Sequence, residues 1–338
     1  MSEGDRVEQQ VEQFRADFEA LRGEIGKLIV GQREVVDGVL GALICGGHVL
    51  LEGLPGTGKT ALARTVAAVV DLAFQRIQCT PDLVPTDVIG TYVIMETPQG
   101  RRTFEFQKGP LFANIVLADH INRTLPKTQA ALLEAMDDGA VTVGTERFSL
   151  PDPYFVIATQ NPQEMEGTFP LPEAELDRFL FKLVVRPPGE QELEEILART
   201  TEATEGGVRR VVDGGRIAEM GQLVREVPVA GPVRRFGVRI VAATHPEAEQ
   251  APELVRKYVR YGAGPRGAQA LILGAKLRAL VEGRYHVSTD DLRQVACPVL
   301  RHRLILNLEG QAEGVAPDRI VGDIIQALTE SSSESAEG

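Results

Sequence analysis

The chain has 338 residues, of which 43% are hydrophobic and 25% are charged, a composition typical of a globular protein with a sizeable core. Its formal net charge of −12 argues against nucleic acid as a partner, because non-specific binding needs a basic face that displaces counterions. An acidic N-terminus, three widely spaced cysteines and no apolar run near the roughly 20 residues that cross a bilayer predict a cytoplasmic protein with no transmembrane segment.

The first part of the chain predicts two helices, then a strand and a glycine-rich loop. Residues 5–28 carry apolar side chains at helical spacing, and a second helical stretch runs from Gln32 to about Cys45. The segment HVLLEG at 48–53 is apolar enough for a buried strand, and TALARTVAAVV at 60–70 continues as a helix. A strand, a glycine-rich loop and a helix in this order predict a phosphate-binding site.

Further strands alternate with helices up to about residue 185. Strands are expected at 73–79, 114–119 and 154–162, a helix at 125–139 and a helix leading into a strand at 175–185. Two hairpins are expected, at 91–106 with turn residues Pro98 and Gly100, and near 141–150. Almost wholly apolar strands alternating with helices predict an α/β fold with a parallel sheet covered on both faces.

The pattern changes at Pro187, Pro188 and Gly189, where we expect a domain boundary. Residues 190–330 then show mainly helical signals. The final segment, SSSESAEG at 331–338, is poor in apolar residues and is expected to be a disordered tail.

The loop GLPGTGKT at 53–60 matches the phosphate-loop pattern in full. Its glycines allow backbone torsions and close approaches that turn amide groups toward phosphate oxygens. Lys59 is expected to neutralise the β- and γ-phosphates, and the Thr60 hydroxyl to bind Mg²⁺. The alternative is a glycine-rich turn that only happens to contain Lys-Thr. The predicted nucleotide-binding residues of the loop are Gly53, Pro55, Gly56, Thr57, Gly58, Lys59 and Thr60.

Asp119 ends the apolar run NIVLAD, the position of a second-shell or water-mediated Mg²⁺ ligand on an adjacent strand. The alternative is an acid that only caps the helix that follows. The next residue, His120, stands where a second acid that activates water is expected.

Four segments together resemble the MoxR family of AAA+ ATPases: residues 53–60, 117–136, 156–180 and 258–280. The resemblance runs in order from about residue 26 to residue 308. It implies an αβα nucleotide-binding domain with a β-hairpin insert and a smaller all-helical lid. With the boundaries above, we expect an N-terminal helix at 1–30, the nucleotide-binding domain at 31–187 and the lid at 188–330. The resemblance also implies ATP and Mg²⁺ as cofactors, and a ring, either a homo-hexamer or a hetero-oligomer. The partner implied is a protein with a von Willebrand factor A domain.

The resemblance also assigns roles to four polar residues. Gln32, with Gly31, matches the segment along the adenine, and Asn161 matches the sensor-1 residue that orients the attacking water. Arg178 matches the arginine finger that reaches a neighbouring subunit's nucleotide, and Arg266 matches the sensor-2 arginine of the lid. Without the resemblance, Asn161 would be interpreted as a turn residue before Pro162 and Arg178 as a solvated helix arginine.

The sequence departs from the family at three positions. His120 replaces the Walker B Glu, whose general-base role is worth typically about 10²–10⁴-fold in rate. We therefore expect ATP binding with slow hydrolysis, although His120 could itself act as a base. His245 replaces an Arg, with no mechanism assigned, and Gly264 replaces a Ser before the Pro-Arg pair at 265–266.

These features predict a ring-forming ATPase, acting as a chaperone that remodels or activates partner proteins. The first alternative is a scaffold that binds ATP and assembles without cycling, which His120 favours. The second is a magnesium-chelatase-like motor subunit, which shares the hairpin insert and the LDRF segment at 176–179.

Overall fold

The computed structural model describes residues 3–96, 102–164, 167–201 and 207–334. They form two compact units, each described by itself here. The sheet unit consists of Ala20–Pro172 and Leu183–Ala218, and the helical unit of Met1–Glu19, Glu173–Lys182 and Glu219–Gly338. Because both units draw on separate stretches of the chain, the domain boundaries expected at 30, 187 and 330 stay a prediction.

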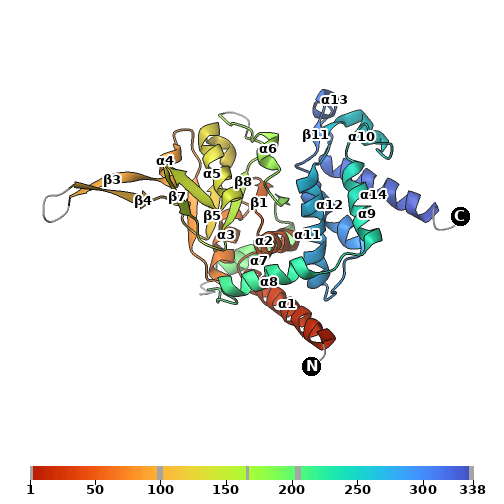
Figure 1. Ribbon diagram of the computed structural model, residues 1–338, viewed down its shortest axis with the longest axis horizontal. Helices are drawn as coiled ribbons and strands as arrows, with labels where there is room; N and C mark the ends of the chain where they lie inside the picture. Colours follow the sequence, from red (N-terminus) through yellow and green to blue (C-terminus); the bar gives the residue numbers. More distant parts are fainter. Residues whose placement is uncertain (1–2, 97–101, 165–166, 202–206, 335–338) are drawn as a thin grey trace. The chain divides into compact units, whose positions relative to one another are not determined.

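A five-stranded sheet in the order β2-β5-β8-β1-β9 forms the centre of the sheet unit (Figure 1). β2 pairs with β5, β5 with β8 and β8 with β1, all in parallel. All five residues of β5 are buried, which explains the apolar run that precedes its last residue, Asp119. The strands are β1 (Val49–Gly53), β2 (Phe74–Gln78), β5 (Ile115–Asp119), β8 (Phe155–Gln160) and β9 (Phe181–Val185), and the last begins in the helical unit.

Most helices of the sheet unit bury apolar side chains, as the periodicity predicts. In α2, for example, eight of twelve residues are buried, from Val35 to Ile44. The helices are α2 (Arg33–Ile44), α3 (Lys59–Val69), α4 (Pro85–Ile89), η1 (Ile121–Arg123), α5 (Pro126–Asp138) and α7 (Glu190–Thr201). The parallel sheet with its helices confirms the predicted α/β class.

Both predicted hairpins are present. β3 (Gly90–Glu96) pairs with β4 (Arg102–Lys108), and the pair extends away from the sheet (Figure 1). β6 (Ala140–Val143) pairs with β7 (Glu146–Ser149). The rings of Phe106 and Phe148 stack at 4.4 Å and so join the two hairpins. The predicted turn residues Pro98 and Gly100 lie outside the described residues.

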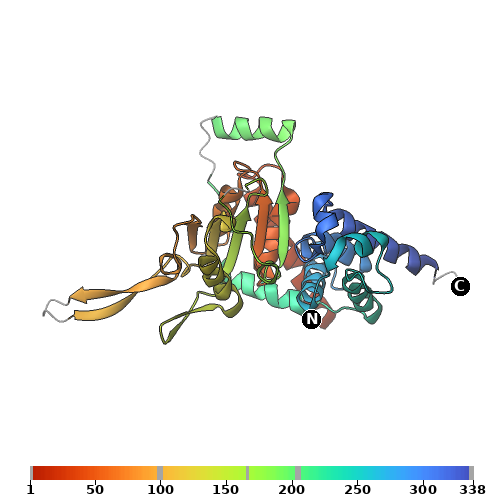
Figure 2. The same ribbon diagram turned by 90° about the horizontal axis from the view of Figure 1, so that it is seen from above.

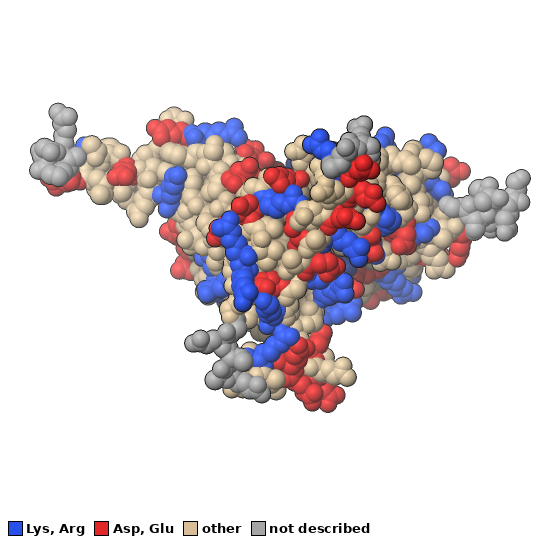
Figure 3. All heavy atoms as spheres, turned by 90° about the horizontal axis from the view of Figure 1, so that it is seen from below, with Lys and Arg blue, Asp and Glu red and all other residues tan. Residues whose placement is uncertain are grey.

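Helix α7 stands off from the sheet and buries none of its residues (Figure 2). Its acidic side chains gather at the lower edge of the view in Figure 3. Leu193 and Leu197 are 48% and 53% exposed. The contact of α7 with the rest of the unit includes hydrogen bonds from Arg199 to the carbonyls of Gly26 and Lys27.

The helical unit is built mainly from α9, α11, α12 and α14, as the helical signals beyond residue 190 predict. Its elements are α6 (Glu173–Leu176), α9 (Gly231–Ala242), α10 (Glu253–Tyr258), β10 (Val259–Tyr261), α11 (Pro265–Val281), α12 (Thr289–Leu300), β11 (Ile305–Leu306), α13 (Leu308–Ala312) and α14 (Pro317–Glu334). α1 (Glu3–Ile25) and α8 (Gly214–Glu226) contribute residues to both units. Because α14 continues to Glu334, the tail predicted at 331–338 begins inside a helix, and residues 335–338 lie outside the described part. Across the described residues, no helix is both long and apolar enough to cross a membrane.

The start of α12 is held by a capping box around a buried carboxylate. Asp291 is 1% exposed and accepts hydrogen bonds from the backbone and hydroxyl of Ser288, both at 2.8 Å. Arg284 donates to its two oxygens at 2.6 and 2.8 Å. Burial opposes ionisation of Asp291, but the bonds from Arg284 and Ser288 outweigh it and hold the pKa of this carboxyl below its usual range.

Asp291→Ala is therefore expected to lower the free energy of unfolding by about 3 kcal/mol, because it removes the carboxylate half of the capping box and leaves a partly buried guanidinium without its anion. Urea unfolding followed by circular dichroism measures the loss. Asp290→Ala is the matched control, since Asp290 is exposed in the same first turn. Equal stability of the two variants would contradict the role given to Asp291.

Candidate nucleotide-binding site

The carboxyl ends of three neighbouring parallel strands bring the predicted residues of the sheet unit together. β1 leads into the phosphate loop, β5 ends at Asp119 and is followed by His120, and β8 is followed by Asn161. Leu51 pairs with Thr159, and Ala118 pairs with Ala158, so the three strands end at nearly the same level. This edge of a parallel sheet is where α/β proteins bind ligands.

The phosphate loop needs its glycines for two different reasons. Gly56 and Gly58 have φ angles of 79° and 84°, which L side chains rarely adopt. Gly53 is required by packing, since a Cβ there would lie 2.6 Å from the carbonyl oxygen of Val185 in β9. The close approach at Gly53 is therefore to a neighbouring strand. The sequence pattern identifies the glycine but not this reason for it.

Lys59 is buried and bonded to its own loop. It is 7% exposed, and its Nζ donates to the carbonyls of Gly53 at 2.8 Å and Leu54 at 2.7 Å. Burial lowers the pKa of Lys59, and the nearby charge of Asp119 opposes that change. The loop thus holds a desolvated cation among neutral carbonyls, a favourable surrounding for an anionic group.

Gln32, the residue predicted to lie along the adenine, is hydrogen-bonded to the same loop. Its side-chain amide donates to the carbonyl of Thr57 at 3.1 Å. Gln32 and Gly31 both have positive φ angles, 51° and 64°. The torsion therefore favours glycine at residue 31, whereas the atoms nearest to an added Cβ belong to the Glu192 carboxylate in α7, the end of a flexible side chain that can move aside.

Asp119 is almost completely buried, with 4% of its side chain exposed, and its oxygens have partners on three elements. Oδ1 accepts a hydrogen bond from Thr159 at 2.7 Å, and Oδ2 accepts two from Arg76, at 2.6 and 3.0 Å. The hydroxyl of Thr60 lies 3.5 Å from Oδ2. Burial opposes ionisation of Asp119, but the bonds from Thr159 and Arg76 hold its pKa below the usual range.

His120 adopts the left-handed conformation, with φ 59° and ψ 52°. His, like Asn and Asp, tolerates this region better than most side chains. Its backbone N–H donates to the Thr159 hydroxyl at 2.8 Å, and its Nδ1 lies 3.9 Å from Oδ1 of Asp119. The ring is therefore beside the carboxylate, at a distance beyond a normal hydrogen bond.

Asn161 and the two arginines lie in different units. Asn161 follows β8, and its side-chain oxygen accepts from the backbone of Gln163 at 3.2 Å, which is the turn geometry that its position before a proline suggests. Arg178 and Arg266 belong to the helical unit. Arg178 follows α6, where its backbone N–H donates to Glu175, and Arg266 lies in the first turn of α11.

Sequence reasoning missed Arg303, which holds the segment around Arg178. The guanidinium of Arg303 is buried and donates to the carboxylate of Asp177 at 2.7 Å and to the carbonyl of Phe179 at 2.7 Å. These partners flank Arg178 on both sides. His245, one of the departures from the family pattern, has its Nε2 3.1 Å from the carbonyl oxygen of Ala263, close before α11.

Arg76 and Thr159 were also missed as partners of Asp119. Both lie in strands that the sequence predicts, but only the strand order β2-β5-β8 places them on either side of Asp119. The one available signal was the Arg in an otherwise ordinary strand at 73–79, since an isolated charge in a sheet often has a buried partner.

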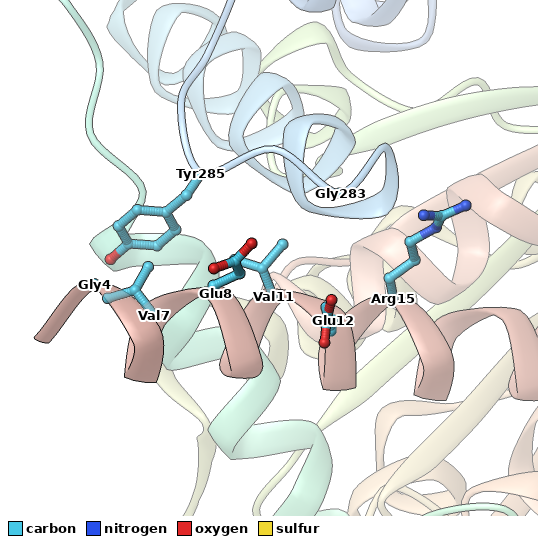
Figure 4. Close-up of a pocket in the computed structure, with 8 residues that line it drawn as sticks. All are labelled: Gly4, Val7, Glu8, Val11, Glu12, Arg15, Gly283 and Tyr285. Carbon is cyan, nitrogen blue, oxygen red and sulfur yellow. The ribbon is translucent and has the colours of Figure 1, made fainter. Parts of the chain in front are cut away.

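A surface hollow of about 670 Å³ lies elsewhere, in the helical unit (Figure 4). Tyr285, in the segment that follows α11, faces the first turns of α1 near Val7. None of the predicted nucleotide-site residues lines this hollow. Its lining residues are Gly4, Val7, Glu8, Val11, Glu12, Arg15, Gly283 and Tyr285.

Comparison with known proteins agrees with this geometry. Residues 48–181 match the ATPase family associated with various cellular activities (AAA), and residues 251–324 match the AAA lid domain. The chain is 41% identical to Chaperone MoxR1 of Mycobacterium tuberculosis over 90% of this chain and 80% of that protein, and 31% identical to Protein MoxR of Methylorubrum extorquens over 91% and 92%. A crystal structure of an inferred ATPase from Cytophaga hutchinsonii matches with a TM-score of 0.88 at 37% identity, covering 97% of this chain and 98% of that one. The chain therefore belongs to the MoxR family of AAA+ ATPases.

Proposed function

We propose that this protein binds ATP with Mg²⁺ at the edge of its parallel sheet and hydrolyses it slowly, to remodel or activate partner proteins. The observation that carries the proposal is the convergence of the phosphate loop, Asp119 and Asn161 at the ends of adjacent parallel strands. Hydrolysis of ATP is the general activity of the family. The name of the relative Chaperone MoxR1 supports the remodelling role.

The residues at the strand ends fit a magnesium ion. Thr60 and Asp119 offer a hydroxyl and a carboxylate oxygen, 3.5 Å apart, and Mg²⁺ prefers hard oxygen ligands and usually takes others from the nucleotide's phosphates. A bound ion would neutralise charge on the β- and γ-phosphates. Lys59 would bind the same phosphates, and Gln32 would lie beside the adenine.

The proposed assembly is a ring, either a homo-hexamer or a mixed ring, with residues 31–187 as the nucleotide-binding domain and 188–330 as the lid. Arg178 would complete the site of a neighbouring subunit, and Arg266 would connect the lid to the γ-phosphate. The proposed partner is a protein with a von Willebrand factor A domain in the cytoplasm. An active site completed by a neighbour's arginine would make turnover depend on assembly.

A second candidate function is a scaffold that binds ATP and assembles without cycling. The observation in its favour is His120, which is not a carboxylate and lies 3.9 Å from Asp119 in a left-handed backbone conformation. Both candidates require ATP binding, and only the first requires turnover above the level of a variant that cannot bind nucleotide.

Lys59→Ala tests the binding that both candidates share. We expect its affinity for MgATP to be weaker by about 10- to 100-fold, because charge-assisted hydrogen bonds to phosphate are worth about 1.5–3 kcal/mol. Titration calorimetry with a non-hydrolysable ATP analogue measures the affinity, and phosphate release from ATP measures turnover.

Lys127→Ala is the matched control, since Lys127 is an exposed lysine of the same unit. Equal affinity of the Lys59 and Lys127 variants would refute the nucleotide site. Tight binding by the unchanged chain with turnover no greater than that of Lys59→Ala would favour the scaffold over the slow ATPase.

A further inference from the structure

Arg76 donates hydrogen bonds to Oδ2 of Asp119, the same carboxylate oxygen that faces Thr60. Its Nε and Nη2 donate to Oδ2 of Asp119 at 3.0 and 2.6 Å, while Thr159 takes Oδ1. The hydroxyl of Thr60 is 3.5 Å from Oδ2. The oxygen best placed to serve a metal ion beside Thr60 is therefore already engaged by a guanidinium.

This pairing has a physical reason that does not involve a metal. A carboxylate with only 4% of its surface exposed needs a compensating charge and hydrogen bonds. Arg76 supplies both from β2, the strand adjacent to β5, although the two residues are 43 positions apart in the chain. Arg76 is thus the counter-ion of Asp119 in this structure.

A divalent cation would compete with this counter-ion. A cation and a guanidinium bound to one oxygen repel each other, and each reduces the negative charge available to the other. Arg76 lies at the border of the sheet, because β2 is an edge strand, and the side chain of Arg76 is 35% exposed. The guanidinium thus has direct access to solvent.

We propose that Arg76 is a competitor of Mg²⁺ for Asp119 and so sets the divalent-cation affinity of the nucleotide site. The proposal rests on the proposed function, since it assumes that Asp119 serves a nucleotide-bound metal. Arg76 acts through Asp119, so it is a positioning residue. A purely structural role for Arg76 makes the opposite prediction, because loss of a structural partner would disorder Asp119 and weaken metal binding.

The test is the affinity of the protein–ADP complex for Mn²⁺, measured from the electron paramagnetic resonance signal of the free ion. Arg76→Gln is expected to bind Mn²⁺ about tenfold more tightly than the unchanged chain, since the metal no longer has to displace a charge-assisted hydrogen bond. Arg64→Gln, which removes the same charge from an exposed position in α3, is expected to leave the affinity unchanged.

A double-mutant cycle tests whether the gain in Mn²⁺ affinity acts through Asp119. In an Asp119→Asn background, Arg76→Gln is expected to give no gain, because the contested charge is gone. Arg76→Lys keeps the charge but donates from a single point, so its affinity for Mn²⁺ is expected to lie between those of the unchanged chain and of Arg76→Gln. If Arg76→Gln does not fold, Arg76→Lys is measured instead.

Unchanged or weaker Mn²⁺ affinity in Arg76→Gln would overturn the proposal, as would a gain that persists with Asp119→Asn. If no variant binds Mn²⁺ while ADP binding still depends on Lys59, the proposal fails and the nucleotide site stands. If ADP does not bind either, the proposed function fails with it.

Discussion

His120→Glu is expected to raise the steady-state rate of phosphate release from ATP by about 10²- to 10⁴-fold, the usual contribution of a general base. In the unchanged chain, the imidazole of His120 would have to act as the base, and its Nδ1 lies 3.9 Å from Oδ1 of Asp119. The carboxylate of a Glu at this position would reach farther from the end of β5. Affinity for MgATP should change little, since the phosphate loop is untouched. Phosphate release at saturating ATP and calorimetric binding, measured side by side, separate the two effects.

His120→Gln is the control for shape, because it has the size of Glu without its basicity. It is expected to stay at or below the rate of the unchanged chain. Glu and Gln should both lower stability by about 1 kcal/mol, since the left-handed conformation at residue 120 suits long side chains poorly. If the unchanged chain already turns over ATP as fast as the Glu form, His120 is a working base, and slow hydrolysis is the wrong prediction.

Arg178→Ala, made in the His120→Glu background so that the rate can be followed, is expected to lower turnover by about 10³-fold or more, as for removal of other arginine fingers. The reason is that the guanidinium stabilises charge on the transferring phosphoryl group, which exists only in the transition state. Affinity for MgATP should therefore fall much less than the rate. Phosphate release at saturating ATP measures the rate, and calorimetry measures the affinity for MgATP.

Mixing of subunits tests whether Arg178 acts on a neighbour. Arg178→Ala subunits keep their phosphate loop, and Lys59→Ala subunits keep their arginine, so a mixture of the two inactive forms should recover part of the activity. Arg319→Ala removes an exposed arginine of the same unit and is expected to have no effect. Full turnover by Arg178→Ala would show that another residue, or none, serves as the finger.

The phosphate loop and the alternation of strands and helices could be predicted from the sequence because both are local. Gly56 and Gly58 have the positive φ angles that the motif requires, and the run ending at Asp119 is a buried strand, as its apolar residues indicate. Torsional preference and the spacing of apolar side chains depend only on residues that are close in the sequence. The predicted hairpins at 91–106 and near 141–150 follow from the same kind of signal.

The environment of the predicted residues was decided only by the tertiary structure. Gly53 is required because β9 brings Val185 against it, and Arg76 meets Asp119 because β2 lies beside β5. Arg303 braces the segment around Arg178 from more than a hundred residues away in the chain. None of these contacts leaves a pattern among neighbouring residues, because each depends on which strands and helices become adjacent. The sequence by itself thus determined which groups could bind a nucleotide, and the order of the strands decided which charges those groups face.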